Sequence, residues 1–317
     1  PYVVYPWSVR DTMCRQLSRS INRDTRSFFE AMTQRFSTKI EIGESNVGTR
    51  GVFTKRALAK GEVISVEKPL VSAVIPQQEA VGGEEGEIGH GETNHRTRLE
   101  NCILDQMKRT GKCAPLIHLL IPKIFELQYE KSDVFEQILR LSSWADDRPL
   151  FQPDFTIPWF SFIGHHNLAL SYWGLATEGL VMKRNEAFAQ DLTESFSFEW
   201  YCQMHHILAV NTFMSHCHDG GIPHGINLYG LTSYYNHSCA ANARTRFCDS
   251  SETEIMITAD RSIDAGEEIF INYLGDECAA MESNERRAML HSTYHFHCMC
   301  TRCVAEQISA ATNTTKQ

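Results

Sequence analysis

Four cysteines constrain the fold of this chain more than any other feature of its sequence. Cys298, Cys300 and Cys303 fall within six residues, so one short loop can supply three thiolates. A structural zinc ion takes four tetrahedral ligands, and such closed sites are built from cysteine and histidine. We expect Cys239 to be the fourth ligand, because it ends the other distinctive segment, Asn-His-Ser-Cys at 236–239. Four thiolates leave no open coordination position, so this zinc would be structural.

Other ligand sets remain open at this point. His295 and His297 are rival zinc ligands, although their alternation about Phe296 predicts a short strand with one side inward. A chance clustering of reduced thiols is the plainer interpretation, and three cysteines in six residues argue against it. The histidines at 165–166, 205–206 and 215–218 suggest a second metal. No neighbouring acid or cysteine completes a plausible set there, and we expect these pairs on helix surfaces.

Composition narrows the class of protein. Eleven cysteines among 317 residues, seven of them scattered, favour a reducing compartment over a disulfide framework. The net charge of −9 argues against direct nucleic-acid binding and favours a basic partner. No run reaches the roughly 18 to 20 apolar residues of a membrane span, so no membrane partner is expected. The most apolar run, 114–127, contains two prolines and a lysine, and it predicts a buried helix.

Periodicity divides the chain into β-rich and helical parts. Strands are expected at 39–42, 63–66 and 70–75, with turns at 48–51 and at Gly61. Residues 76–95, with five Gly and five Glu, predict a polar loop. This loop is either a solvated linker or a segment whose negative charge attracts a basic substrate. Helical spacing then dominates 96–215. It includes an Asp133/Glu136 capping pair and a helix over 199–213.

Strands return at 245–248, 254–258 and 268–273, followed by a helix at 281–291 and a polar, frayed tail after 306. Each β-rich segment is too small to fold alone, so we expect the two to build one domain around the helical insertion. Residues 1–37 carry six arginines and three acids. They faintly resemble a transit peptide, but a basic amphipathic helix over 9–36 is favoured. The predicted units are 1–37, 38–75, 76–205, 206–290, 291–305 and 306–317.

With these residues assembled, four blocks in order resemble the SET-domain methyltransferases, and within them the SET-and-MYND branch. The blocks are Gly-Thr-Arg-Gly-Val-Phe at 48–53 with 59–62, the segment 235–242 around Asn-His-Ser-Cys, 263–273 ending in Tyr273, and 285–303 with the cysteines. Thr49 and Ala241 depart from residues common in that family. The MYND zinc module and the C-terminal helical-repeat domain of the branch are not found.

The resemblance implies an α+β fold of small twisted sheets with a pseudoknot and a zinc-bearing post-SET segment. It implies a protein lysine N-methyltransferase that uses S-adenosylmethionine on a lysine of a histone or another protein or peptide. Tyr273 and Tyr294 would be catalytic. The cofactor would be held by Arg50, Asn211, Ser233, Asn236, His237, Tyr273 and Phe296, and structural Zn²⁺ by Cys239, Cys298, Cys300 and Cys303.

Plainer interpretations stand beside these roles. Tyr273 could be a core strand tyrosine, Asn236 a buried turn residue, and Asn211 a satisfied polar group on an apolar helix. Tyr294 and Phe296 could simply pack over the zinc loop. The main alternative for the whole chain is an inactive SET-type, zinc-containing protein-binding module, and a nucleic-acid-binding zinc protein is a third. An intracellular site, in nucleus or cytoplasm before mitochondrion, is expected.

Overall fold

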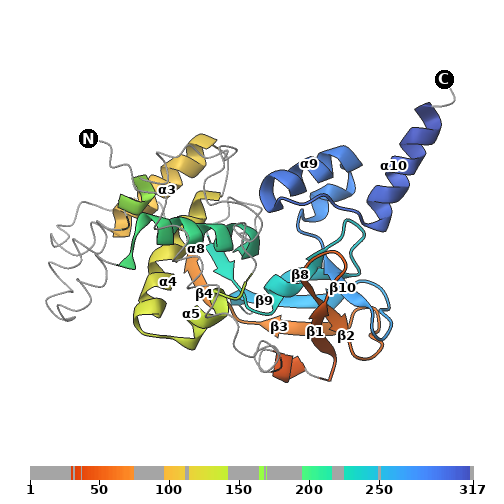
Figure 1. The fold of residues 1–317 in the computed structure, drawn as a ribbon, viewed down its shortest axis with the longest axis horizontal. Coiled ribbons are helices and arrows are strands. Elements are labelled where there is room, and N and C mark those ends of the chain that lie inside the picture. Colours follow the sequence, from red (N-terminus) through yellow and green to blue (C-terminus); the bar gives the residue numbers. More distant parts are fainter. Residues whose placement is uncertain are drawn as a thin grey trace, which may run out of the picture.

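The computed structural model describes residues 38–74, 96–110, 114–141, 195–215, 225–248 and 251–314, together with 30, 33–36, 164–167 and 169 (Figure 1). The predicted helix over 9–36 and the polar loop over 76–95 lie outside these residues, apart from the 3-10 turn η2 (Gln34–Phe36). The strands are β1 (Ile40–Glu44), β2 (Arg50–Thr54), β3 (Val63–Glu67), β4 (Val71–Val74), β5 (Thr212–Ser215), β6 (Gly225–Leu228), β7 (Asn236–His237), β8 (Ala243–Cys248), β9 (Ser251–Ala259) and β10 (Glu268–Ile271). The helices are α3 (Arg96–Thr110), α4 (Leu120–Tyr129), α5 (Asp133–Ile138), α8 (Phe198–Asn211), α9 (Ser283–Tyr294) and α10 (Thr301–Thr314), with 3-10 turns η3 (Ala114–Leu119), η6 (Thr232–Tyr234) and η7 (Asp276–Ala279).

The first sheet contains strands from both β-rich segments of the sequence. Its order is β1-β2-β10-β7, with β10 antiparallel to β2 and parallel to β7. Ile269 lies opposite Val52, and Ile271 lies opposite His237. The prediction that the two distant β segments build one structure is therefore confirmed.

The other two sheets repeat this pairing of early and late strands. One has the order β3-β9-β8 and the other β4-β6-β5. Their inward-facing residues, such as Ile64 and Ile257, are almost completely buried with Val52 and Ile269 of the first sheet. In β4, burial of alternate residues reflects one inward face, whereas all four residues of β6 are buried.

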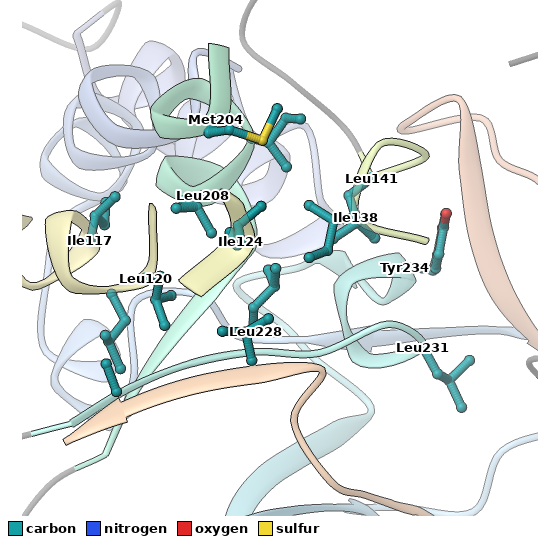
Figure 2. Close-up of a cluster of buried hydrophobic side chains, with 14 of the residues drawn as sticks. Ile117, Leu120, Ile124, Ile138, Leu141, Met204, Leu208, Leu228, Leu231 and Tyr234 are labelled. Carbon is teal, nitrogen blue, oxygen red and sulfur yellow. The ribbon is translucent and has the colours of Figure 1, made fainter. Parts of the chain in front are cut away.

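The helical insertion packs on the third sheet. Figure 2 shows Leu120 and Ile124 of the η3–α4 segment and Leu208 of α8 converging above Leu228 of β6. These four side chains are fully buried. The apolar run at 114–127 is thus a buried helical segment, as predicted. Each such side chain removed from water contributes roughly 1.5–3 kcal/mol of apolar transfer free energy.

Two helices begin at serine caps that bind backbone N–H groups. The Ser197 hydroxyl accepts from the Trp200 N–H over 3.1 Å, and the Ser132 hydroxyl accepts from the Val134 N–H over 3.2 Å. The predicted Asp133/Glu136 capping pair is wrong in this detail, because Ser132 is the cap and Asp133 is the first helical residue. A serine cap of this kind is worth about 1 kcal/mol.

Three local predictions differ from the structure. The helix expected over 199–213 ends at Asn211, because Thr212 is extended and pairs with Leu228 in the third sheet. The strand expected around Phe296 is absent, since His295 takes a left-handed conformation (φ 58°) and ends α9. The tail expected to fray after 306 is helical to residue 314 (α10), and in Figure 1 this helix projects beyond the sheets.

Within the described part of the chain, no helix has both the length and the apolar character that a membrane crossing requires.

Candidate active site and metal centre

The four predicted cysteines form one compact group. Cys239 follows β7, Cys298 and Cys300 lie between α9 and α10, and Cys303 is in the first turn of α10. Their sulfur atoms all lie within 4.8 Å of one another, with Cys239 Sγ 3.8 Å from Cys298 Sγ and 3.6 Å from Cys303 Sγ. Tetrahedral zinc with Zn–S bonds of about 2.3 Å separates its sulfurs by roughly 3.8 Å. The donor set and its spacing fit zinc.

A buried guanidinium lies beside the cysteines and would share with zinc the neutralisation of their thiolate charge. The hydrogen bond from Cys239 to the Cys298 sulfur and burial raise the pKa of Cys239, and burial raises the pKa of Cys303. A central dication makes simultaneous ionisation of four close thiols favourable. The fully buried guanidinium of Arg286 lies against the same group, with Nη2 3.4 Å from Cys303 Sγ and 2.8 Å from the Glu306 carboxylate. Arg286 therefore compensates part of the thiolate charge.

The rival ligands are not part of this group. Among the described residues, the only set of three or more metal-ligating side chains within reach of one another is the four-cysteine cluster. His297 is exposed and stacks on His291, with ring centroids 4.7 Å apart. The pairs at 165–166 and 205–206 are buried, not on helix surfaces as expected. His166 packs against Phe196 and Tyr201, while His165 and His205 both pack against the ring of His118.

Tyr273 stands at the centre of an aromatic group. Its ring centroid lies 4.9 Å from that of Tyr294, 5.2 Å from that of His237 and 6.4 Å, edge to face, from that of Phe296. Its hydroxyl donates to the Tyr235 carbonyl oxygen over 2.7 Å. Burial, with smaller contributions from Tyr294 and Glu268, raises the pKa of Tyr273, so the phenol stays neutral.

The sheet register explains how Tyr273 reaches this position. Parallel pairing sets Ile271 of β10 opposite His237 of β7, and Tyr273 follows two residues later. The backbone N–H of Tyr273 then donates to Nδ1 of His237 over 3.0 Å. Because Nδ1 accepts, the proton of the neutral imidazole is on Nε2, which faces Cys239 Sγ at 3.3 Å. One imidazole thus links the aromatic group to the metal centre.

Asn236 and Arg50 meet where the turn before β2 crosses β7. The Asn236 amide donates to the Arg50 carbonyl oxygen over 2.8 Å and to Glu268 Oε1 over 2.7 Å. A Cβ at Gly51 would lie 2.2 Å from Glu268 Oε1, so a larger residue there would have to displace the Glu268 carboxylate. Arg50 therefore contributes its backbone carbonyl to the orientation of Asn236.

Asn211 and Ser233 contact each other beside the segment that leads into β7. The Ser233 hydroxyl lies 2.7 Å from the Tyr229 carbonyl oxygen and 3.4 Å from that of Asn211. The buried Asn211 amide donates to the Ile207 carbonyl of its own helix over 2.7 Å. These contacts anchor α8 to residues 229–233, and they match the plainer interpretation of Asn211 as a satisfied polar group.

Sequence reasoning missed four contributors to the site. They are the Tyr235 carbonyl, the Ser45 hydroxyl, the Glu268 carboxylate as a partner of Asn236, and the Arg286 guanidinium. The Tyr235 carbonyl and the Ser45 hydroxyl have no recognisable signature in one sequence. Glu268 and Arg286 stood in blocks that were recognised, but their contacts come from distant parts of the chain.

Comparison with known proteins agrees with this geometry. Residues 49–274 match the model of the SET domain. The chain is 42% identical over 84 residues to the chicken (Gallus gallus) protein-lysine N-trimethyltransferase SMYD5. The aligned segment covers 26% of this chain and 19% of that protein. It is 28% identical over 214 residues to the mouse (Mus musculus) SMYD5, covering 65% and 44% respectively. The chain belongs to the SET-domain family.

The chain spans less than half the length of these two curated relatives. A solved structure of Rubisco LSMT bound to AdoMet aligns with a TM-score of 0.42 and 13% sequence identity, covering 87% of this chain and 57% of that one.

Proposed function

We propose that this chain is a protein lysine N-methyltransferase that uses S-adenosylmethionine. The observation that carries the proposal is Tyr273, a half-buried neutral phenol anchored on the Tyr235 carbonyl and flanked by Tyr294 and His237. It lies within residues 49–274, which match the SET domain. The names of the chicken and mouse relatives, protein-lysine N-trimethyltransferases, support a lysine-containing protein or peptide as the substrate.

The chemistry asks for a neutral amine held in line with the methyl donor. S-adenosylmethionine, when bound, supplies an electrophilic methyl group. A free lysine has a pKa of about 10.4 and is almost wholly protonated at neutral pH. Burial between Tyr273 and Tyr294 would favour the uncharged amine, and aromatic walls suit the apolar lysine stem. Correct alignment is worth several kcal/mol of the barrier.

Tyr273 is the residue we assign to orient the amine. Its hydroxyl proton is donated to the Tyr235 carbonyl, so its oxygen lone pairs are available to accept from the lysine nitrogen or to face the transferring methyl group. Tyr294 would form the second wall of the lysine channel. These roles are supported by the parallel β7–β10 pairing, which holds Tyr273 in a fixed relation to His237.

The remaining assigned residues would hold the cofactor. Asn236 and the Arg50 backbone stand at its amino-acid end, His237 at the adenine edge, and Phe296 against the adenine face. Asn211 and Ser233 are proposed as more distant polar contacts. Zinc at the cysteines would order the segment between α9 and α10, which carries Phe296, without taking part in the transfer.

Labelled methyl transfer tests the proposal directly. The purified chain is incubated with methyl-labelled S-adenosylmethionine and a peptide array, and products are read by mass spectrometry. We expect incorporation on lysine that falls by more than about 100-fold in Tyr273→Phe, while cofactor affinity stays within a few-fold. Tyr229→Phe is the matched control, because it removes a buried hydroxyl that also donates to a backbone carbonyl, that of Thr253 at 2.6 Å.

The outcomes separate the alternatives. Cofactor binding without transfer to any peptide or protein would support the inactive protein-binding module. Absence of both cofactor binding and transfer would overturn the proposal. Equal losses in Tyr273→Phe and Tyr229→Phe would assign the Tyr273 hydroxyl to stability instead of chemistry.

A further inference from the structure

The amide of Asn236 has one defined orientation. Its Nδ2 donates one proton to the Arg50 carbonyl oxygen and the other to Glu268 Oε1. An amide nitrogen carries two protons, so both are used. The flipped amide would set Oδ1 against a carbonyl and a carboxylate, with no proton to share. Oδ1 is therefore the atom that Asn236 presents as an acceptor.

Glu268 is itself held rigidly. The Ser45 hydroxyl lies 2.9 and 3.0 Å from its two carboxylate oxygens, and its backbone carbonyl accepts from the Asn242 amide over 2.8 Å. Its carboxylate is thus held between Ser45, in the turn after β1, and the amide of Asn236. Ser45 is 223 positions and Asn236 is 32 positions away from Glu268 along the chain.

Gly48, in the turn between β1 and β2, has no side chain to crowd Asn236 Oδ1. A Cβ built at Gly48 would lie 2.9 Å from Asn236 Oδ1, closer than real Cβ atoms approach. Any larger residue at this position would therefore crowd the acceptor atom. Among the described residues, none donates a hydrogen bond to Asn236 Oδ1.

We propose that Glu268 is a positioning residue that turns Asn236 Oδ1 toward a cationic donor, the α-ammonium of the cofactor's amino-acid end. The inference rests on the proposed function. Its physical basis is twofold: Glu268 and the Arg50 carbonyl leave Asn236 only an acceptor to offer, and the carboxylate's negative charge favours a positive group beside it over the cofactor's carboxylate. Glu268 acts through Asn236 and need not touch the cofactor.

Two nucleosides separate this role from a general structural one. S-adenosylhomocysteine carries the α-ammonium, whereas 5′-methylthioadenosine has the same adenosine and thioether without the amino-acid end. Binding of both is measured by calorimetry. Glu268→Met removes both the charge and the acceptor, so we expect its Kd for S-adenosylhomocysteine to rise about tenfold or more while its Kd for methylthioadenosine stays within about twofold. Glu268→Gln keeps an acceptor oxygen, so its Kd for S-adenosylhomocysteine should lie between those of the wild type and Glu268→Met.

Glu267→Met is the matched control. That neighbouring carboxylate binds Arg261 and the Asn242 amide, not Asn236. We expect it to leave both affinities unchanged, whatever it does to thermal stability. Ser45→Ala removes a hydrogen-bond partner of Glu268 but no charge. We expect it to raise the Kd for S-adenosylhomocysteine by a few-fold.

Three results would overturn the inference. Equal weakening of both nucleosides in Glu268→Met would assign Glu268 a purely structural role. Unchanged S-adenosylhomocysteine affinity in a folded Glu268→Met protein would show that the amide needs no such partner. A wild-type chain that binds neither nucleoside would remove the proposed function and this inference with it, and that outcome is distinguishable from the other two.

Discussion

The backbone N–H of Tyr273 donates to Nδ1 of His237 over 3.0 Å, and the opposite nitrogen of the same ring faces Cys239 Sγ at 3.3 Å. The strand end that carries the candidate catalytic tyrosine is therefore joined to the metal centre through one imidazole. Groups that hydrogen-bond to metal ligands tune both the position and the affinity of the site.

His237→Phe keeps a ring at this position but removes both hydrogen bonds. We expect zinc affinity, measured by chelator competition, to fall about 10–100-fold. Exchange of the Tyr273 amide proton should also accelerate, because its acceptor is gone. His291→Phe, on the exposed face of α9, is the control and should change neither quantity. Unaltered exchange at Tyr273 would contradict the link.

Loss of one zinc ligand should unfold the C-terminal segment before the sheets. In Cys303→Ser we expect substoichiometric zinc by elemental analysis and faster hydrogen exchange over 295–309, because four ligands fix the geometry of that segment. Residues 225–248 and 251–259, which belong to the buried sheets, should keep their protection. Cys102→Ser on α3 is the control, and an equal effect there would show that the cysteines do not act as a metal site.

Glu67 fastens the turn that leads into β7. Its carboxylate accepts the backbone N–H groups of Gly230, Leu231 and Thr232 at 2.8–2.9 Å and the Thr232 hydroxyl at 2.7 Å. Burial raises the pKa of Glu67, while the four hydrogen bonds act in the opposite direction. Glu67→Gln sets an amide N–H₂ against these donors.

We therefore expect Glu67→Gln to lower the free energy of unfolding by about 2–4 kcal/mol in urea titrations. Glu41→Gln, on the exposed side of β1, should change it by less than about 0.5 kcal/mol. A loss at Glu67 no larger than at Glu41 would show that the turn is held by other contacts.

The buried histidines predict acid sensitivity. Burial is the main cause that lowers the pKa of His118 well below its usual value and the pKa of His205 to about 3. Unfolded histidine has a pKa of about 6.5, so the unfolded state takes up protons first as the pH falls. The contribution of these neutral rings to stability is complete above about pH 6.5 and is lost progressively below it.

We expect each ring to steepen the fall in unfolding free energy by up to about 1.4 kcal/mol per pH unit below pH 6. Urea titrations at pH 7.5, 6.0 and 5.0 measure this slope. The unfolding free energy of His205→Leu should fall less steeply with pH than that of the wild type over that range. Glu62, whose pKa the Arg56 hydrogen bond lowers to about 2, acts only at lower pH. Parallel curves for the two proteins would refute the assignment.

Most strands and the zinc ligands were accessible from local patterns. The alternation at 39–42, the apolar residues of 63–66, and the spacing of Cys298, Cys300 and Cys303 all depend on residues close in sequence. The failures occurred where a long-range partner overrode a local preference. Thr212 left the helix to pair with Leu228. The rings of His205 and His206 are buried edge to face against each other, and His205 also packs against the distant His118.

The sequence alone determined which chemical groups are present: the four thiols, the Asn-His-Ser-Cys segment, and a tyrosine at the end of a strand. Tertiary structure decided how those groups are aimed. The Asn236 amide is oriented by Arg50 and Glu268, 186 and 32 positions away, and the Tyr273 hydroxyl by a carbonyl 38 positions away. Hydrogen-bond direction depends on where distant backbone atoms come to lie, and no local pattern encodes that.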